Sequence, residues 1–152
     1  MKIRFGVILI VIAGLMFIAH GAGFVYRTYY TPGFELGVDA LDGVTANELA
    51  ERDPEIASYI DHLHVNVAAL MFSVGLAMML LAWFGIRNRM RWAWTASIVV
   101  PLVFIAISIP LHQHVHFDFD ALLHLGPAAV GAPVMIAGAA LAHAGLREGG
   151  KA

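Results

Sequence analysis

The chain has 152 residues, of which 60% are hydrophobic and only 13% are charged, and its formal net charge is -2. Its mean hydropathy is +0.77, and the apolar residues gather in four long blocks. This composition excludes an ordinary soluble domain and a nucleic-acid-binding surface, and the absence of cysteine excludes disulfides and thiolate ligands. We therefore expect an all-α membrane protein, a four-transmembrane-helix antiparallel bundle forming a single domain over residues 1–152.

Each apolar block is close to the roughly 20 residues that a helix needs to cross a bilayer. The expected spans are 5–26, 60–85, 92–110 and 120–146, with a polar outer loop over 27–58. The first block also follows a basic start, as a cleaved signal peptide would. Because its apolar run is long for a signal peptide, we expect a retained helix, with cleavage as the alternative.

The outer loop carries signals for helix starts. Thr45 and Glu48 have the spacing of a capping box, which predicts a short helix over Ala46–Arg52. Asp53 and Pro54 then have the residue types of an N-cap and a first helical position. We expect the helix that begins there to run unbroken into the second span.

The cations lie mainly on one side of this topology. Arg27 and Arg52 share the outer side with ten of the eleven acids, whereas both termini and the turn after the second span are basic. By the positive-inside rule the termini are cytoplasmic, and the protein belongs in the cell membrane with the lipid bilayer as its first partner. The seven cations on the inner side are Lys2, Arg4, Arg87, Arg89, Arg91, Arg147 and Lys151.

Histidines gather at the outer ends of the spans. The stretch from His112 to His124, HQHVHFDFDALLH, holds four histidines and two aspartates in thirteen residues. Antiparallel helices bring alternate ends to one membrane level, so residues far apart in the chain converge there. The histidines concerned are His62, His64, His112, His114, His116 and His124, with His20 close to the outer end of the first span.

Spacing indicates which of these side chains can meet. Asp120 and His124 share a face of a helix at i,i+4. An extended run over 112–118 would point alternate side chains, including all three histidines of that run, to one side. A helical run would pair only His112 with His116. In the second span His64 is preferred over His62, because Asp61 lies one turn before it.

Neutral imidazole and carboxylate are ligands for zinc, copper(II) and non-haem iron, so the pattern predicts a transition-metal site at the outer face. Sequence does not distinguish these metals. Haem held by two histidines such as His64 and His124 is less favoured, because the cluster has more donors than a haem needs. The predicted ligands are His64, His112, His116, His124 and Asp120, and the additional or supporting residues are His62, Asp61, His114, Asp118 and His20.

Three functional interpretations remain open at this stage. The first is a small oxidoreductase or a metal-handling subunit, with no catalytic residue assigned. The second is a non-enzymatic subunit of a larger membrane complex or homo-oligomer, whose polar cluster contacts a protein or a quinol. The third is a pH-responsive sensor or transporter, because histidine changes charge near pH 6.5. Whether the chain is an enzyme is left open.

The charge asymmetry makes a direct prediction about topology. Reporter fusions at Arg89 and at Asn47 should report opposite sides of the membrane, with Arg89 cytoplasmic. Matched alkaline phosphatase and fluorescent-protein fusions at both sites measure this. If both sites report one side, the four-span topology is wrong, and with it the convergence of the histidines.

Overall fold

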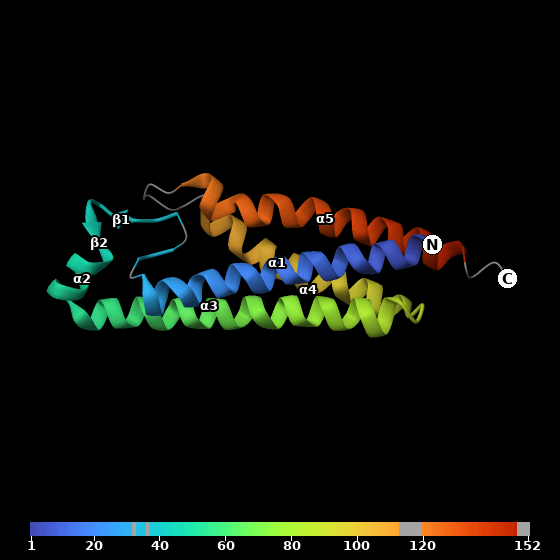
Figure 1. The fold of residues 1–152 in the computed structure, drawn as a ribbon, viewed down its shortest axis with the longest axis horizontal. Helices are drawn as coiled ribbons and strands as arrows, with labels where there is room; N and C mark the ends of the chain where they lie inside the picture. The colour runs from blue at the N-terminus through green and yellow to red at the C-terminus, as the bar shows by residue number, and fades with distance from the viewer. Residues whose placement is uncertain (32, 36, 113–119, 149–152) are drawn as a thin grey trace.

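The computed structural model describes residues 1–31, 33–35, 37–112 and 120–148, and most of these are helical (Figure 1). A two-stranded hairpin and a short helix separate the first long helix from the second. The elements in chain order are α1 (Lys2–Tyr30), β1 (Ala40–Leu41), β2 (Val44–Thr45), α2 (Ala46–Arg52), α3 (Pro54–Leu80), the π-helix η1 (Leu81–Ile86), α4 (Arg91–His112) and α5 (Ala121–Glu148).

Three of the described helical segments are long and apolar enough to cross a membrane. They are Lys2–Tyr30, Pro54–Ile86 and Ala129–Glu148. The apolar part of α4, Arg91–Ile107, is shorter, and α4 also contains Pro101 and Pro110. The protein is therefore all-α with three candidate membrane spans.

The helix starts between α1 and α3 follow the local signals in the sequence. Thr45 Oγ1 accepts from the Glu48 amide at 3.3 Å, and the Glu48 carboxylate accepts from the Thr45 amide at 2.8 Å. The Thr45 hydroxyl also donates to the Glu48 carboxylate at 2.9 Å. The bonds that this carboxylate accepts, from the Thr45 backbone first and from the hydroxyl second, hold the pKa of Glu48 below its usual value. The Asp53 side chain accepts from the Ile56 amide at 3.1 Å, and α3 runs unbroken from Pro54, as predicted.

The hairpin before α2 is built on a tight turn. Asp42 and Gly43 both have positive φ, 49° and 78°, between the paired residues Leu41 and Val44. An Asp-Gly pair with positive φ at both positions suits a two-residue hairpin, because its backbone twist matches that of the strands. The hairpin thus ends the loop compactly just before α2 begins.

Helix α1 packs between α3 and α5, and glycine makes its contact with α3 close. A β-carbon added at Gly14 would lie 2.7 Å from the Gly75 carbonyl oxygen, and one at Gly21 would lie 3.0 Å from that of Ala68. The two contacts are seven residues apart on both helices, so they define one antiparallel register. Small residues at such positions let helix backbones approach closely in lipid.

The contact of α1 with α5 is also made close by glycine residues. A β-carbon at Gly6 would lie 2.7 Å from the Gly138 carbonyl oxygen, and one at Gly145 would lie 2.7 Å from the Ile3 amide nitrogen. Ala142, at the same contact, is fully buried. Helix α1 is consequently held from two sides by backbone-to-backbone contact, and its position fixes the level of both neighbours.

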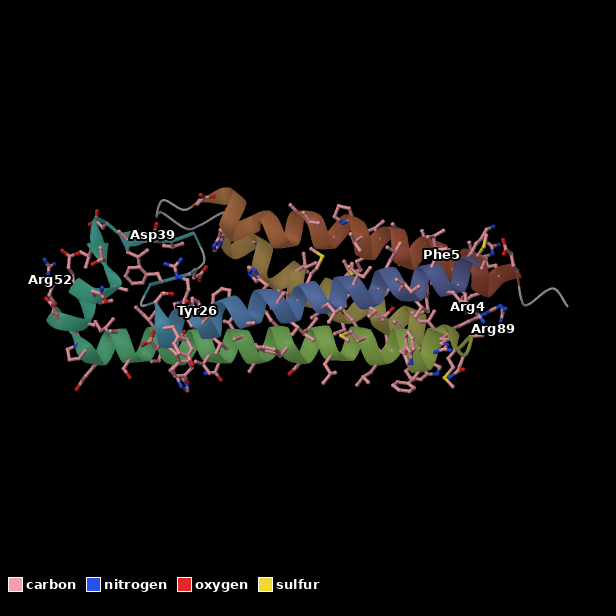
Figure 2. All side chains as sticks on the ribbon, viewed as in Figure 1. Arg4, Phe5, Tyr26, Asp39, Arg52 and Arg89 are labelled. Atoms are coloured by element: carbon pink, nitrogen blue, oxygen red, sulfur yellow. The ribbon has the colours of Figure 1, made fainter. Side chains whose placement is uncertain are left out.

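One end of the bundle, here called the arginine end, joins the start of α1, the turn from η1 to α4 and the last turn of α5. Lys2 pairs with Glu148, and Arg89 Nη1 donates to the Gly145 carbonyl at 3.3 Å. Figure 2 shows Arg4 and Arg89 at this end, and Asp39 and Arg52 at the opposite one. The hairpin and α2 also lie at that opposite end (Figure 1).

The glycine contact between α1 and α3 predicts a sharp difference between two substitutions in α3. Gly75→Leu should destabilise the protein by about 1–3 kcal/mol, because a side chain there forces the two backbones apart. Ala69→Leu, on the exposed face of the same helix, should change stability little. Thermal unfolding of both variants in detergent measures this, and equal midpoints would contradict the close-contact interpretation.

Candidate functional site

The close contacts of α1 with α3 and with α5 place three histidines at one end of the bundle. One turn beyond the Gly21 contact with Ala68, Phe24 reaches His64 of α3, and their ring centroids lie 5.7 Å apart edge to face. Phe24 also contacts His20 of its own helix, with centroids 5.4 Å apart. His124 enters from the first turn of α5. We call this place, with His20, His64 and His124, the histidine end.

The segment after α1 folds over the histidine end and brings a carboxylate to it. Phe34 and Val38 are buried, and Glu35 between them places Oε2 at 3.5 Å from His124 Nε2. The Asp120 amide donates to the Gly37 carbonyl at 2.7 Å, which ties this segment to the start of α5. The charge of Glu35 also acts on His20 and His64.

The imidazoles of this end are largely shielded from solvent. His64 is 7% exposed and His124 is 8% exposed. His20 is half-buried, and its Nδ1 atom has no hydrogen-bond partner among the described residues. A buried polar atom without a partner costs free energy, so such an atom calls for an explanation such as a bound ion or a proton donor.

Arg27 anchors the covering segment from α1. Its Nη2 donates to Asp39 Oδ1 at 3.2 Å, while its buried Nε has no hydrogen-bond partner within the described part of the chain. A β-carbon at Gly33 would lie 2.2 Å from Arg27 Nη2, so the guanidinium lies directly against the backbone of this segment. The charge of Arg27 also acts on His64.

The predicted site residues separate into three groups. His64 and His124 are buried at the histidine end, and His20 lies beside them. Asp61, His62 and Asp120 are exposed. His62 Nε2 lies 3.1 Å from the side-chain nitrogen Nδ2 of Asn66, and the Asp120 backbone carbonyl accepts from the His124 backbone amide at 2.8 Å. Of the histidine run, His112 ends α4 without a described side chain, and His114, His116 and Asp118 lie outside the described residues.

The described donors do not form a complete metal site by themselves. Among residues 1–31, 33–35, 37–112 and 120–148, no group of three His, Asp or Glu side chains is arranged to hold one ion. Phe24 packs against both His20 and His64. Within the described part of the chain, His124 and Glu35 approach each other directly.

Sequence reasoning missed Glu35 and Arg27. Both lie in the stretch that was assigned to a polar outer loop, where charged residues are expected to face water. The available signal was the pair Phe34 and Val38, whose apolar side chains at i,i+4 indicate a segment that packs on the bundle. Such packing carries Glu35 inward with it.

Neither a known protein family, nor a curated protein, nor a solved structure matches this chain. The geometry of the histidine end and the polarity of the two ends are therefore the basis for any functional conclusion.

The pairing of Glu35 with His124 makes a testable prediction about the covering segment. Glu35→Gln should lower stability by up to about 1 kcal/mol, because Glu35 is 40% exposed and solvent screens the lost charge. Amide exchange at Val38, whose N–H donates to the Glu35 carbonyl at 3.0 Å, should become faster. Glu51→Gln in α2 is the control; equal exchange rates in both variants would show that the Glu35 side chain does not hold the segment.

Proposed function

We propose that the chain is a multi-pass protein of the cell membrane with four spans: the three candidate spans described above and, in addition, α4. Helix α4 starts at the arginine end, whereas α5 starts at the histidine end and finishes at the arginine end. The chain must therefore cross from one end to the other along α4. Its 22 residues extend about 33 Å at 1.5 Å per residue, which matches a hydrocarbon core of about 30 Å. The positive-inside rule then makes the arginine end cytoplasmic and the histidine end external.

We further propose that the histidine end binds a transition-metal ion. The observation that carries this proposal is the approach of His124 Nε2 to Glu35 Oε2 at 3.5 Å, in a place where the imidazole is buried. Neutral imidazole and carboxylate together suit zinc, copper(II) or non-haem iron. His20, with its unpartnered buried nitrogen, is the next donor.

The remaining donors in this proposal come from the histidine run. The start of α5 at Ala121 and the end of α4 at His112 bound the segment that contains His114 and His116. In this proposal His64, which packs against Phe24 from α3, does not bind the ion itself. This assignment replaces Asp120 by Glu35 as the carboxylate ligand, because Asp120 is exposed.

An ion in this position would act close to the external surface, beneath the buried side chains of Phe34 and Val38. There it would serve as a redox centre or as a Lewis acid, as in a small oxidoreductase or a metal-handling subunit. The half-exposed Glu35 is the described group through which solvent would reach the ion.

A second candidate function is that of a non-enzymatic subunit in a larger membrane complex. A shallow groove of about 520 Å³ on α3 favours it, lined by Pro54, Glu55, Ser58, Tyr59 and His62. This groove presents an aromatic ring and an imidazole outward, whereas His64 faces the interior. A partner subunit or a quinol head group would find both apolar and hydrogen-bonding contacts there.

The metal proposal is tested on purified wild type, His124→Ala, Glu35→Gln and His62→Ala. Wild type should carry about one ion per chain at pH 8 and less at pH 5, because ligation requires neutral imidazole. His124→Ala should lose the ion and Glu35→Gln should weaken its binding, while the exposed His62→Ala should retain it. Elemental analysis gives the metal content, and thermal unfolding shows that each variant is folded.

Two results would overturn the metal proposal. One is wild type that carries no stoichiometric metal at pH 8 after reconstitution with zinc, copper or iron. The other is a folded His124→Ala variant that keeps its ion. In either case the subunit interpretation becomes the leading one, and loss of a co-purifying partner from His62→Ala is the measurement that supports it.

A further inference from the structure

The arginine end carries an apolar groove that the metal proposal does not involve. It has a volume of about 420 Å³ and lies where η1 gives way to α4. Phe84 and Trp92 on its walls are mostly exposed. The residues that line it are Leu80, Leu81, Phe84, Gly85, Met90 and Trp92, and almost all of the surface they present is apolar.

Local backbone geometry creates this groove. The π-helix η1 interrupts the regular α-helical turn at the end of the second span, and such bulges occur frequently at functional sites. The Met90 amide donates to the Gly85 carbonyl at 3.1 Å, and Arg89 adopts a positive φ of 62°, which reverses the chain tightly. A side chain at Gly85 would collide with Ala93, so glycine lets α4 start close against η1.

The turn that follows the groove in the chain is rich in arginine. Arg91 stands between the lining residues Met90 and Trp92, and Arg87 follows Gly85 by two positions. The Arg87 guanidinium lies 4.6 Å from the centre of the Trp83 ring, in a cation–π contact one position before the lining residue Phe84. Between Asp61 and Asp118 the sequence has no acidic residue, so η1, α4 and the part of α3 after Asp61 carry no carboxylate that could compete for these cations.

A bilayer supplies a molecule with matching chemistry. At the end of a membrane span the apolar wall faces acyl chains and the basic turn faces head groups. Guanidinium groups bind phosphate with paired hydrogen bonds, and basic pockets between membrane helices are known to retain anionic lipid head groups. A zwitterionic lipid could fill the same groove, but its head group has no net negative charge to pair with Arg87 and Arg91.

We propose that this groove is a binding site for one anionic phospholipid. An acyl chain lies along Leu80, Phe84 and Trp92, and the phosphate is bound by Arg91 and Arg87. Arg89 does not take part, because its guanidinium donates to the Gly145 carbonyl. The site stands whether or not the histidine end binds metal, since the two lie at opposite ends of the bundle.

The test measures lipid retention by native mass spectrometry of the full chain in detergent. Phosphatidylglycerol and phosphatidylcholine with identical acyl chains are the probes. Wild type should retain one phosphatidylglycerol in preference to phosphatidylcholine, and Arg91→Gln should reduce that preference about fivefold. Arg52→Gln, an exposed arginine at the opposite end, is the matched control and should leave the preference unchanged.

A second variant separates the groove from the charge. Leu80→Trp fills the groove from a half-exposed position and should reduce retention of both lipids, while the thermal midpoint stays near that of wild type. Equal retention of the two lipids by wild type would overturn the proposal. So would an equal effect of Arg52→Gln and Arg91→Gln, since the preference would then reflect overall charge.

Discussion

The close contact of the α1 backbone with its two neighbours is the constraint on which the rest of the structure depends. In lipid, apolar side chains gain little from meeting one another, so helix association relies on close packing. Gly14 and Gly75 provide that packing toward α3, and Gly6 and Gly138 provide it toward α5. Because both contacts are between backbones, neither neighbour can slide without a collision.

This packing determines which polar groups meet at the histidine end. One turn past the last small-residue contact, Phe24 brings His20 and His64 into the same layer, and α5 starts beside them with His124. The covering segment adds Glu35 because Phe34 and Val38 gain by burial. The pairing of a buried imidazole with a partly exposed carboxylate thus results from forces that act mainly on apolar and small residues.

The two ends of the bundle differ in chemistry for different reasons. The arginine end is basic because of a short turn, and its groove results from the π-helix and from Gly85. The histidine end is enclosed because a long connection folds back over it. A proposed lipid site at one end and a proposed metal site at the other follow from these two connections, whereas the helices mainly keep them apart.

Much of the fold was predictable from the sequence because it depends on neighbours within about one helical turn. Long apolar runs, the capping box at Thr45, and the start of α3 at Asp53 and Pro54 are local features of this kind. The asymmetry of the cations is likewise a property of the sequence alone. The preference for His64 over His62 rested only on its spacing from Asp61, and their difference in burial is set by how α3 faces α1.

Tertiary structure alone decided which side chains meet. The pairing of Glu35 with His124 and the contact of Phe24 with His64 each join residues far apart in the chain. No local pattern specifies them, because the register between two helices is set by the fit of whole faces. The sequence by itself determined what the helices are made of and where they start; the packing of glycine against backbone determined what they bring together.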